Sequence, residues 1–331
     1  MSETFRHPAL FYRGDAEYLD ALVPFVRDGL DAGDRVAVAV PGERGELLRS
    51  ALGAADAARV RFTDMARAGR NPGRIIPSVL TAFCDDRAAA SDAQRGVRIV
   101  GEPVWPGRTA VEYAACVQQE ALINTAFEGR PITILCPYDA SGLPAEALAD
   151  AHVTHPAVID GGAERSSPDY DPQRAIAAHD LAPAQPADAA CFPFERERLR
   201  DARQFAVASA AALGLTGRLL DDLALAVAEL TTNSVLYGGG SGVVGVWAED
   251  GQVVCQVQDA GLLADPLAGC RVPPPGRPGG RGLLMVHQIA DLVRVHSGAD
   301  GTAVRLFLAL PDHDPAATLA EAVTTPGLTP A

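Results

Sequence analysis

Residues 228–240 read AELTTNSVLYGGG. They cover the last part of a helix that the apolar spacing predicts over Thr216–Leu236, and the four residues that follow it. Within that helix Glu229 and Asn233 lie four residues apart, so both side chains can reach one site. An Asn carbonyl oxygen suits Mg²⁺, which takes few protein ligands and keeps waters and phosphates. A nearby carboxylate can polarise a hydroxyl for attack on a phosphate. Taken alone, however, such a pair is more often two ordinary surface residues.

A second polar segment follows the strand predicted over 252–259, which ends in Asp259-Ala260-Gly261. A carboxylate at this place can accept a hydrogen bond from the exocyclic amine of adenine, and it would repel the carbonyl of guanine. Gly261 carries no side chain, which lets a ring approach the backbone. The D-x-G pattern is also a common turn signal, and a plain turn is the more frequent explanation of this segment by itself.

A glycine-rich segment, Gly279-Gly280-Arg281-Gly282, opens the helix predicted over 282–290. Backbone N–H groups at a helix start can face an anion, and the helix dipole favours a phosphate there. Arg281 could add the positive charge that a Lys supplies in other phosphate sites. The alternative is a flexible loop end with a glycine-rich entry to the helix.

The order of these segments says more than any one of them. E-x-x-x-N on a helix is followed by D-x-G, a Pro-rich loop, G-G-R-G-L and finally Gly301-Thr302 at the last strand. Together they resemble the GHKL ATPase domain that histidine kinases, gyrase-type and heat-shock ATPases and bacterial anti-sigma-factor serine kinases share. The resemblance covers about 191–312 and implies an α+β sandwich that binds ATP and Mg²⁺. It implies Glu229 as the catalytic residue, Asn233 as the Mg²⁺ ligand, and these cofactor-binding residues: Asn233, Asp259, Gly261, Gly280, Arg281, Gly282 and Thr302.

Within this class the chain resembles the anti-sigma-factor branch through residues 228–234, the glycines 238–240, Trp247 and residues 281–283. Where that branch usually has a His before the glycines, this chain has Tyr237. The resemblance implies a regulator whose ATPase domain captures a sigma factor and phosphorylates an antagonist protein on Ser or Thr.

Two other functions stay open at this point. In the first, the domain is a non-catalytic binding module for which ATP is only a conformational ligand. In the second, the chain is a histidine kinase, which needs a phosphoacceptor His on a dimerising helix hairpin. His179 is the nearest candidate, but 11 residues separate it from Cys191, and Pro183 and Pro186 interrupt them, so no hairpin fits.

The first half of the chain alternates apolar strands with helices, which favours a parallel sheet covered on both faces. The strands are predicted at 35–40, 59–63, 97–101 and 132–136, and the helices at 43–51, 75–83, 110–127 and 144–152.

Several segments of this half resemble the MEDS sensory domain over about 5–160. They are 101–107, 136–139 and 155–156, together with His7, Glu112 and Glu120. The resemblance implies a RecA-like α/β fold that receives a small-ligand or protein signal. Residues 41–45 follow a strand where a phosphate loop would lie. Because the loop has no Lys, it is interpreted as degenerate and not as a second ATP site.

Polar groups at the strand ends of such a sheet can line a crevice, the usual ligand site of these folds. The candidates are His7, Glu102, Glu120, Cys136 and His155. For each residue alone, a satisfied structural hydrogen bond or a buried thiol is the favoured explanation. A metal site is possible, although the spacing of these residues does not support one.

The second half predicts a mixed sheet with helices on one face. Its strands are expected at 191–194, 242–248, 252–259, 292–296 and 302–310, and its helices at 195–213, 216–236 and 282–290. Residues 161–190 are rich in Gly, Ala, Pro, Ser and Asp, which predicts a mostly extended linker. Residues 313–331 predict a disordered tail.

Composition excludes several functions. The 331 residues contain no Lys, and all 28 basic residues are Arg. This excludes a Walker A loop, a pyridoxal enzyme and a protein kinase of the common eukaryotic type. The net charge of −14 predicts no nucleic-acid or membrane partner. Six Cys without a C-x-x-C pair, and a start without an apolar signal stretch, predict a cytoplasmic protein.

Overall fold

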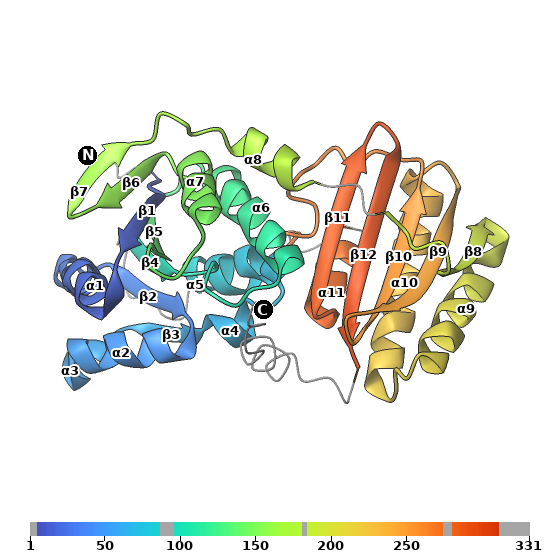
Figure 1. Ribbon diagram of the computed structural model, residues 1–331, viewed down its shortest axis with the longest axis horizontal. Coiled ribbons are helices and arrows are strands. Elements are labelled where there is room, and N and C mark those ends of the chain that lie inside the picture. The colour runs from blue at the N-terminus through green and yellow to red at the C-terminus, as the bar shows by residue number, and fades with distance from the viewer. Residues whose placement is uncertain (1–4, 87–95, 181–183, 274–279, 311–331) are drawn as a thin grey trace, which may run out of the picture. The chain divides into compact units, whose positions relative to one another are not determined.

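The computed structural model describes residues 5–86, 96–180, 184–273 and 280–310. The chain divides into two compact units, each with its own sheet (Figure 1). The first comprises Met1–Leu181 with Cys270–Val272, and the second Ala182–Gly269 with Pro273–Ala331. We refer to them as the N-terminal and the C-terminal domain. None of the described helices has the length and hydrophobicity needed to cross a lipid bilayer.

The N-terminal domain is a sheet with helices packed against it. Its strands are β1 (Pro8–Tyr12), β2 (Arg35–Val40), β3 (Arg61–Asp64), β4 (Val97–Gly101), β5 (Ile132–Asp139), β6 (Ala157–Asp160) and β7 (Ala163–Ser166). Its helices are α1 (Gly14–Ala32), α2 (Gly42–Leu52), α3 (Ala54–Ala57), α4 (Met65–Ala68), α5 (Ala82–Cys84), α6 (Ala110–Ala126), α7 (Ala145–Thr154) and α8 (Pro172–His179). A 3-10 turn at Pro72–Arg74 and a π-helical segment at Ile75–Thr81 precede α5.

The strand order is β3-β2-β4-β5-β1-β6-β7, and every pairing is parallel except β6 with β7. The apolar run of β2 is continuous because both faces of this strand are buried. Val36, Val38 and Val40 pack into a cluster with residues of α1 and α2. Side chains alternate along a strand, so Ala37 and Ala39 face the other side, and they are buried as well. Both faces of the sheet are covered, as the sequence pattern predicts.

The structure has a strand before the one that leads into the loop interpreted as a degenerate phosphate loop. Residues 41–45 follow β2, whose neighbours are β3 and β4. A strand–helix unit that the sequence pattern does not predict, β1 and α1, comes first in the chain, and strand β1 lies between β5 and β6. The 19 residues of α1 include Pro24, which is unfavourable in a helix interior and weakens the helical pattern in the sequence.

The predicted extended linker at 161–190 also needs correction, because the described part of this segment holds regular structure. Gly161 and Gly162, both with positive φ, turn the chain so that β7 pairs antiparallel with β6. Helix α8 follows, capped by the Asp171 side chain, which accepts a hydrogen bond from the Arg174 amide. Ala175 of α8 packs in a small cluster with two α6 residues. These elements are short, so their period is weak in the sequence. The tail at 313–331 lies outside the described residues.

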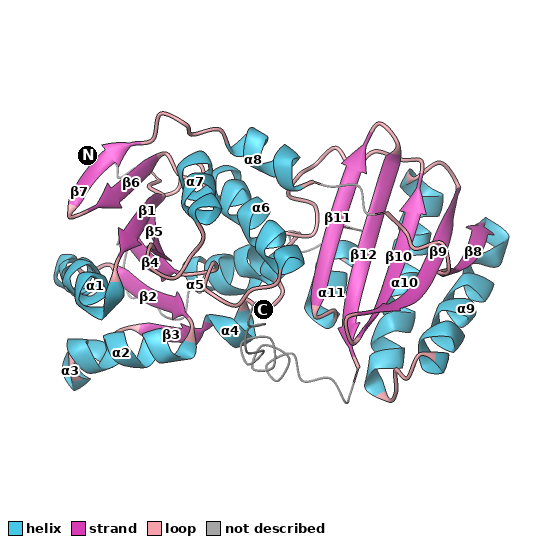
Figure 2. Cartoon of the chain, in the orientation of Figure 1, coloured by secondary structure: helices cyan, strands magenta, loops and turns pink. Residues whose placement is uncertain are grey.

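The C-terminal domain is a two-layer sandwich. It contains β8 (Ala190–Glu195), α9 (Leu199–Ala212), α10 (Arg218–Tyr237), β9 (Ser241–Glu249), β10 (Gln252–Asp259), α11 (Gly282–Ile289), β11 (Leu292–Gly298) and β12 (Gly301–Ala309). The order is β11-β12-β10-β9-β8, and each pairing is antiparallel, so the mixed sheet that we predicted is wrong. Consecutive strands joined by tight turns account for this, since β9 meets β10, and β11 meets β12, directly. The helices cover one face (Figure 2).

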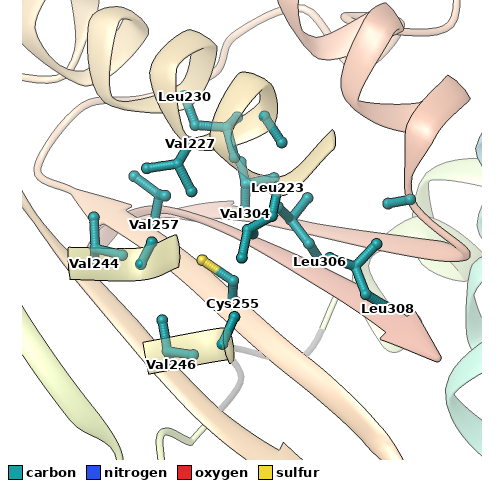
Figure 3. Close-up of a cluster of buried hydrophobic side chains, with 14 of the residues drawn as sticks. Leu223, Val227, Leu230, Val244, Val246, Cys255, Val257, Val304, Leu306 and Leu308 are labelled. Carbon is teal, nitrogen blue, oxygen red and sulfur yellow. The ribbon is translucent and has the colours of Figure 1, made fainter. Parts of the chain in front are cut away.

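The core of this domain orients α10. Leu223, Val227 and Leu230 point from the helix into side chains of the sheet (Figure 3). The predicted apolar stripe therefore faces the sheet. This places Glu229 and Asn233 on the flank of the helix, where both are half-buried.

Candidate active site

Helix α10 and the start of α11 meet at the first two predicted site residues. A Cβ atom placed on Gly282 would lie 2.7 Å from Oε2 of Glu229 and 3.4 Å from Nδ2 of Asn233. The glycine-rich helix start thus lies directly against the E-x-x-x-N pair, although about fifty residues separate them in the chain. Only a residue without a side chain fits at Gly282 with Glu229 in this position.

Asp259 ends β10 and is held by two donors. The hydroxyl of Ser234 donates to its Oδ2 at 2.6 Å, and the amide of Gly261 donates to its Oδ1 at 2.9 Å. A carboxylate can accept about four hydrogen bonds, so it keeps capacity for a further donor. Because Ser234 belongs to α10, its hydrogen bond holds the carboxylate against this helix, one residue along the chain from Asn233.

Close backbone packing surrounds this carboxylate. A Cβ on Gly238 would lie 2.3 Å from Cγ of Asp259, and a Cβ on Gly261 would lie 2.6 Å from the Cα of Gly238. Gly301 has φ of +111°, and a Cβ there would lie 2.1 Å from the Asp259 carbonyl oxygen. Gly238, Gly261 and Gly301 therefore let the end of α10, the D-x-G turn and the start of β12 approach one another.

Thr302 stands opposite Asp259 in the β10–β12 pairing. Its hydroxyl donates to the carbonyl of Gly261 at 2.9 Å and is 2.9 Å from the hydroxyl of Ser297. Ser297 in turn accepts a hydrogen bond from the amide of Leu263 at 2.8 Å. The two hydroxyl groups thus tie the turn after Asp259 to β11 and β12.

The remaining predicted residues lie at the α11 start. Arg281 is the exposed N-cap residue of α11, and Gly280 has φ of +80°. Residues 274–279 of the Pro-rich loop, and with them Gly279, lie outside the described part of the chain.

Sequence reasoning missed Ser234, Ser297, Gly238 and Gly301 as parts of the site. Ser234 had a usable signal, since a polar residue one position after Asn233 falls on the helix side that faces the sheet. Ser297 had none, because its role depends on the β11–β12 register.

These residues suit a purine nucleotide with Mg²⁺. Asp259 offers an oriented acceptor beside the bare Gly261 backbone, and the α11 start brings amide groups to Glu229 and Asn233. The Asn233 oxygen is the kind of hard ligand that Mg²⁺ accepts.

The structure brings four of the five polar residues of the N-terminal half together. His7, Glu120, Cys136 and His155 are all buried, and their ligand-type atoms lie within 4.8 Å of one another. They come from the residue before β1, from α6, from β5 and from the C-cap of α7, two residues before β6. The capping box of Thr109 and Glu112 fixes the start of α6 and so the face on which Glu120 lies.

Glu102, the fifth residue, belongs to another group at the carboxyl edge of the sheet. Its Oε1 accepts a hydrogen bond from the Tyr12 hydroxyl at 2.9 Å. Arg44 lies over the ring of Tyr12 and 3.6 Å from Asp139. Burial raises the pKa of Glu102 from 4.5 to about 7, against the opposing effects of the Tyr12 hydrogen bond and the Arg44 charge.

His179 does not lie on a helix hairpin. It ends α8, which has eight residues, and its Nε2 is 3.1 Å from Oδ2 of Asp150. Among the described residues between α8 and β8 there is no helix. The arrangement argues against a phosphoacceptor hairpin at this place.

The two domains correspond to two known families. Residues 192–308 match the model of the Histidine kinase-like ATPase domain. Residues 6–156 match the model described as the MEthanogen/methylotroph, DcmR Sensory domain, abbreviated MEDS. The chain therefore joins a MEDS sensory domain to a histidine kinase-like ATPase domain, which confirms the fusion that the motifs predicted. A search of curated proteins found no significant match.

Proposed function

We propose that the C-terminal domain binds Mg²⁺ and ATP and acts as a protein serine/threonine kinase of the anti-sigma-factor type. In this proposal it captures a sigma factor and phosphorylates an antagonist protein, under control of the MEDS domain. We assign it to the GHKL type and the N-terminal sheet to the RecA-like type. Six free thiols are consistent with a reducing cytoplasm as its location.

The observation that carries the proposal is the convergence of three motifs on one end of the sandwich. Ser234, next to Asn233, donates to Asp259, while Gly282 lies against Glu229 and Asn233. Adenine selection, magnesium binding and phosphate binding are thereby linked through α10. A surface pair or a plain turn, the simpler explanations of each motif, does not require this contact.

The residues divide the chemistry among them. Asp259 would accept the adenine amine, and the α11 amide groups with Arg281 would hold phosphate oxygens. Mg²⁺ at Asn233 would neutralise charge on the phosphates. Glu229 would accept the proton of a Ser or Thr hydroxyl as its oxygen bonds to the γ-phosphorus and the bond to ADP breaks.

The MEDS domain would supply the control. Tyr12, Glu102, Arg44 and Asp139 gather at the carboxyl edge of its parallel sheet, where ligands of such sheets usually bind. Its loop at 41–45 contains no Lys, so we propose that it receives a small ligand or a protein signal and no nucleotide.

The test is a phosphotransfer assay with labelled ATP and purified candidate antagonists encoded beside this chain. We expect label on Ser or Thr of an antagonist with the wild-type chain and none with Glu229→Gln. ATP-dependent capture of the antagonist without label would favour the non-catalytic binding module. Label on a His of this chain would favour a histidine kinase.

A further inference from the structure

The four buried polar residues of the N-terminal domain have no part in the function proposed above. Each side chain is at most 1% exposed: His7, Glu120, Cys136 and His155. Such a concentration of ionisable groups in a protein interior is costly unless the groups are paired with each other or with a metal. We propose that these four residues bind one zinc ion.

The distances are those of a four-coordinate site. Sγ of Cys136 is 3.3 Å from Nε2 of His7, and that nitrogen is 3.5 Å from Oε2 of Glu120. Nε2 of His155 is 2.8 Å from the same carboxylate oxygen. Tetrahedral zinc, with bonds of about 2.0–2.3 Å, holds its ligand atoms roughly 3.3–3.8 Å apart. The two distances from Nε2 of His7 fall within this range, whereas the shorter approach of His155 to Glu120 and the outer limit of 4.8 Å for the whole group require shifts of about 1 Å.

The Nδ1 atoms of both histidines, which lie on the outside of the cluster, already have hydrogen-bond partners. The Nε2 atoms therefore point toward the middle of the four side chains. Nδ1 of His155 is 3.0 Å from the Ala151 carbonyl oxygen, which can only accept, so this nitrogen carries the proton. Nδ1 of His7 is 3.1 Å from Oδ1 of Asn124. Asn124 is fixed in that orientation because its Nδ2 donates to the carbonyl of Thr154 at 2.8 Å. Outer hydrogen bonds of this kind are typical of metal-binding histidines.

The inner atoms are left facing one another. With Nδ1 protonated, the neutral ring of His155 has a lone pair on Nε2, directed at Oε2 of Glu120. Both atoms are buried, and neither has a hydrogen-bond partner of good geometry. Two lone pairs at 2.8 Å repel unless a proton or a metal ion lies between them. A metal ion would fill this place and would also coordinate the thiol and the second imidazole, which a single proton cannot do.

Charge and donor type select zinc. A thiolate, a carboxylate and two neutral imidazoles carry a charge of −2, which one divalent ion neutralises inside the protein. A sulfur ligand with two imidazoles disfavours Mg²⁺ and Ca²⁺, which prefer oxygen. Four protein ligands and full burial leave no open position for a substrate, so the site is structural. It would join α6 to the segments that lead into β1 and β6 and to β5.

Metal content of the full chain tests the proposal. The wild-type chain is purified without chelators and dialysed first against zinc and then against metal-free buffer. Its zinc content is measured by inductively coupled plasma mass spectrometry. We expect about one zinc per chain, a loss of at least about tenfold in Cys136→Ser, and no loss in Cys116→Ser. Cys116 is a matched control, since it is a buried thiol of the same domain whose Sγ contacts the Pro103 carbonyl. Equal zinc in both variants, or no zinc in the wild type, overturns the proposal.

Cobalt substitution of the wild-type chain tests the zinc proposal if Cys136→Ser does not fold. Wild-type chain loaded with Co²⁺ should show the intense visible bands of tetrahedral cobalt and a thiolate-to-cobalt band in the near ultraviolet. Weak bands of octahedral cobalt, or a spectrum without the thiolate band, would overturn it. Neither result depends on nucleotide binding, so a failure here is distinct from a failure of the kinase proposal.

Discussion

The two domains build polar sites in opposite ways. In the C-terminal domain, the candidate site lies where a helix end, a strand end and a helix start meet, and its key side chains, Glu229, Asn233 and Asp259, are half-buried. Glycines make room, and Asp259 keeps free acceptor capacity. In the N-terminal domain, four side chains lie wholly inside, each ring held by an outer hydrogen bond. The first arrangement suits a ligand that exchanges, and the second suits an ion that stays.

The largest effect should come from removing the proposed base of the open site. Glu229→Ala is expected to lower the phosphotransfer rate by about 10²–10⁴-fold, the usual cost of losing a general base. ATP affinity should change little, because Glu229 is not assigned to nucleotide binding. Single-turnover phosphotransfer and equilibrium ATP binding are measured on the same preparations. A variant with full phosphotransfer would show that Glu229 is not the base.

Glu102 belongs neither to the nucleotide site nor to the proposed zinc site, so it allows a separate test of the carboxyl edge of the N-terminal sheet. Its pKa is about 7 in the folded chain and near 4.5 when unfolded, so folding favours its protonated form. The stabilising contribution is complete below pH 4.5 and is lost as the pH rises to 7, by about 3 kcal/mol at most. Denaturant unfolding of Glu102→Gln should show a flatter pH profile in this window. The exposed Glu43→Gln serves as control, and an unchanged profile for Glu102→Gln would contradict the account.

The closed site depends on residues that do not touch the metal. Asn124→Ala removes the acceptor that orients His7, and we expect zinc affinity to fall about 10–100-fold, as for other outer-shell changes. Competition with a chromophoric chelator measures this affinity. Gln118→Ala on the same helix is the control, since its side chain reaches only the Ile176 carbonyl. Equal affinity in the two variants would remove Asn124 from the site.

The smallest effect concerns the orientation of Asp259. Ser234→Ala removes one of its two donors, and a net hydrogen bond of about 1 kcal/mol corresponds to roughly fivefold weaker ATP binding. Thr231→Val is the matched control, because the Thr231 hydroxyl bonds only to carbonyls within α10. If both variants bind ATP equally, Ser234 does not position the carboxylate.

The sequence named the residues of both candidate sites, but it indicated that they share a site only for the open one. The period of α10 and the order of the motifs along the chain sufficed to name Glu229, Asn233 and Asp259. The closed site comes from four elements, and its residues are spread from His7 to His155 without metal-ligand spacing. Only the pairing of β1 with β5 and β6 brings them together. Each residue was a candidate by its place near a strand end or on a helix, but no local pattern joined the four into one site.

Element length explains most of the errors in the fold, although the 19-residue helix α1 has no predicted counterpart. The bounds of long helices such as α10 and α6 are predicted to within a few residues, because the spacing of their apolar residues shows which face is buried. Strands β1 and β7 and helix α8 are short, and their formation depends on partners distant in the chain or on a cap. The direction of each strand in the C-terminal sheet likewise depends on which strands pair, and the sequence pattern does not predict these pairings.

The most direct test of the account is calorimetric titration of the full chain with ATP and with GTP, in the presence of Mg²⁺. We expect one ATP site that discriminates against GTP. Asp259→Ala should weaken ATP about 10- to 150-fold, the value of a charged hydrogen bond of about 1.5–3 kcal/mol. The exposed Asp221→Ala on α10 should bind ATP like the wild type. Equal affinities for ATP and GTP, or unchanged ATP binding by Asp259→Ala, would contradict the assignment of this domain as an adenine-nucleotide site.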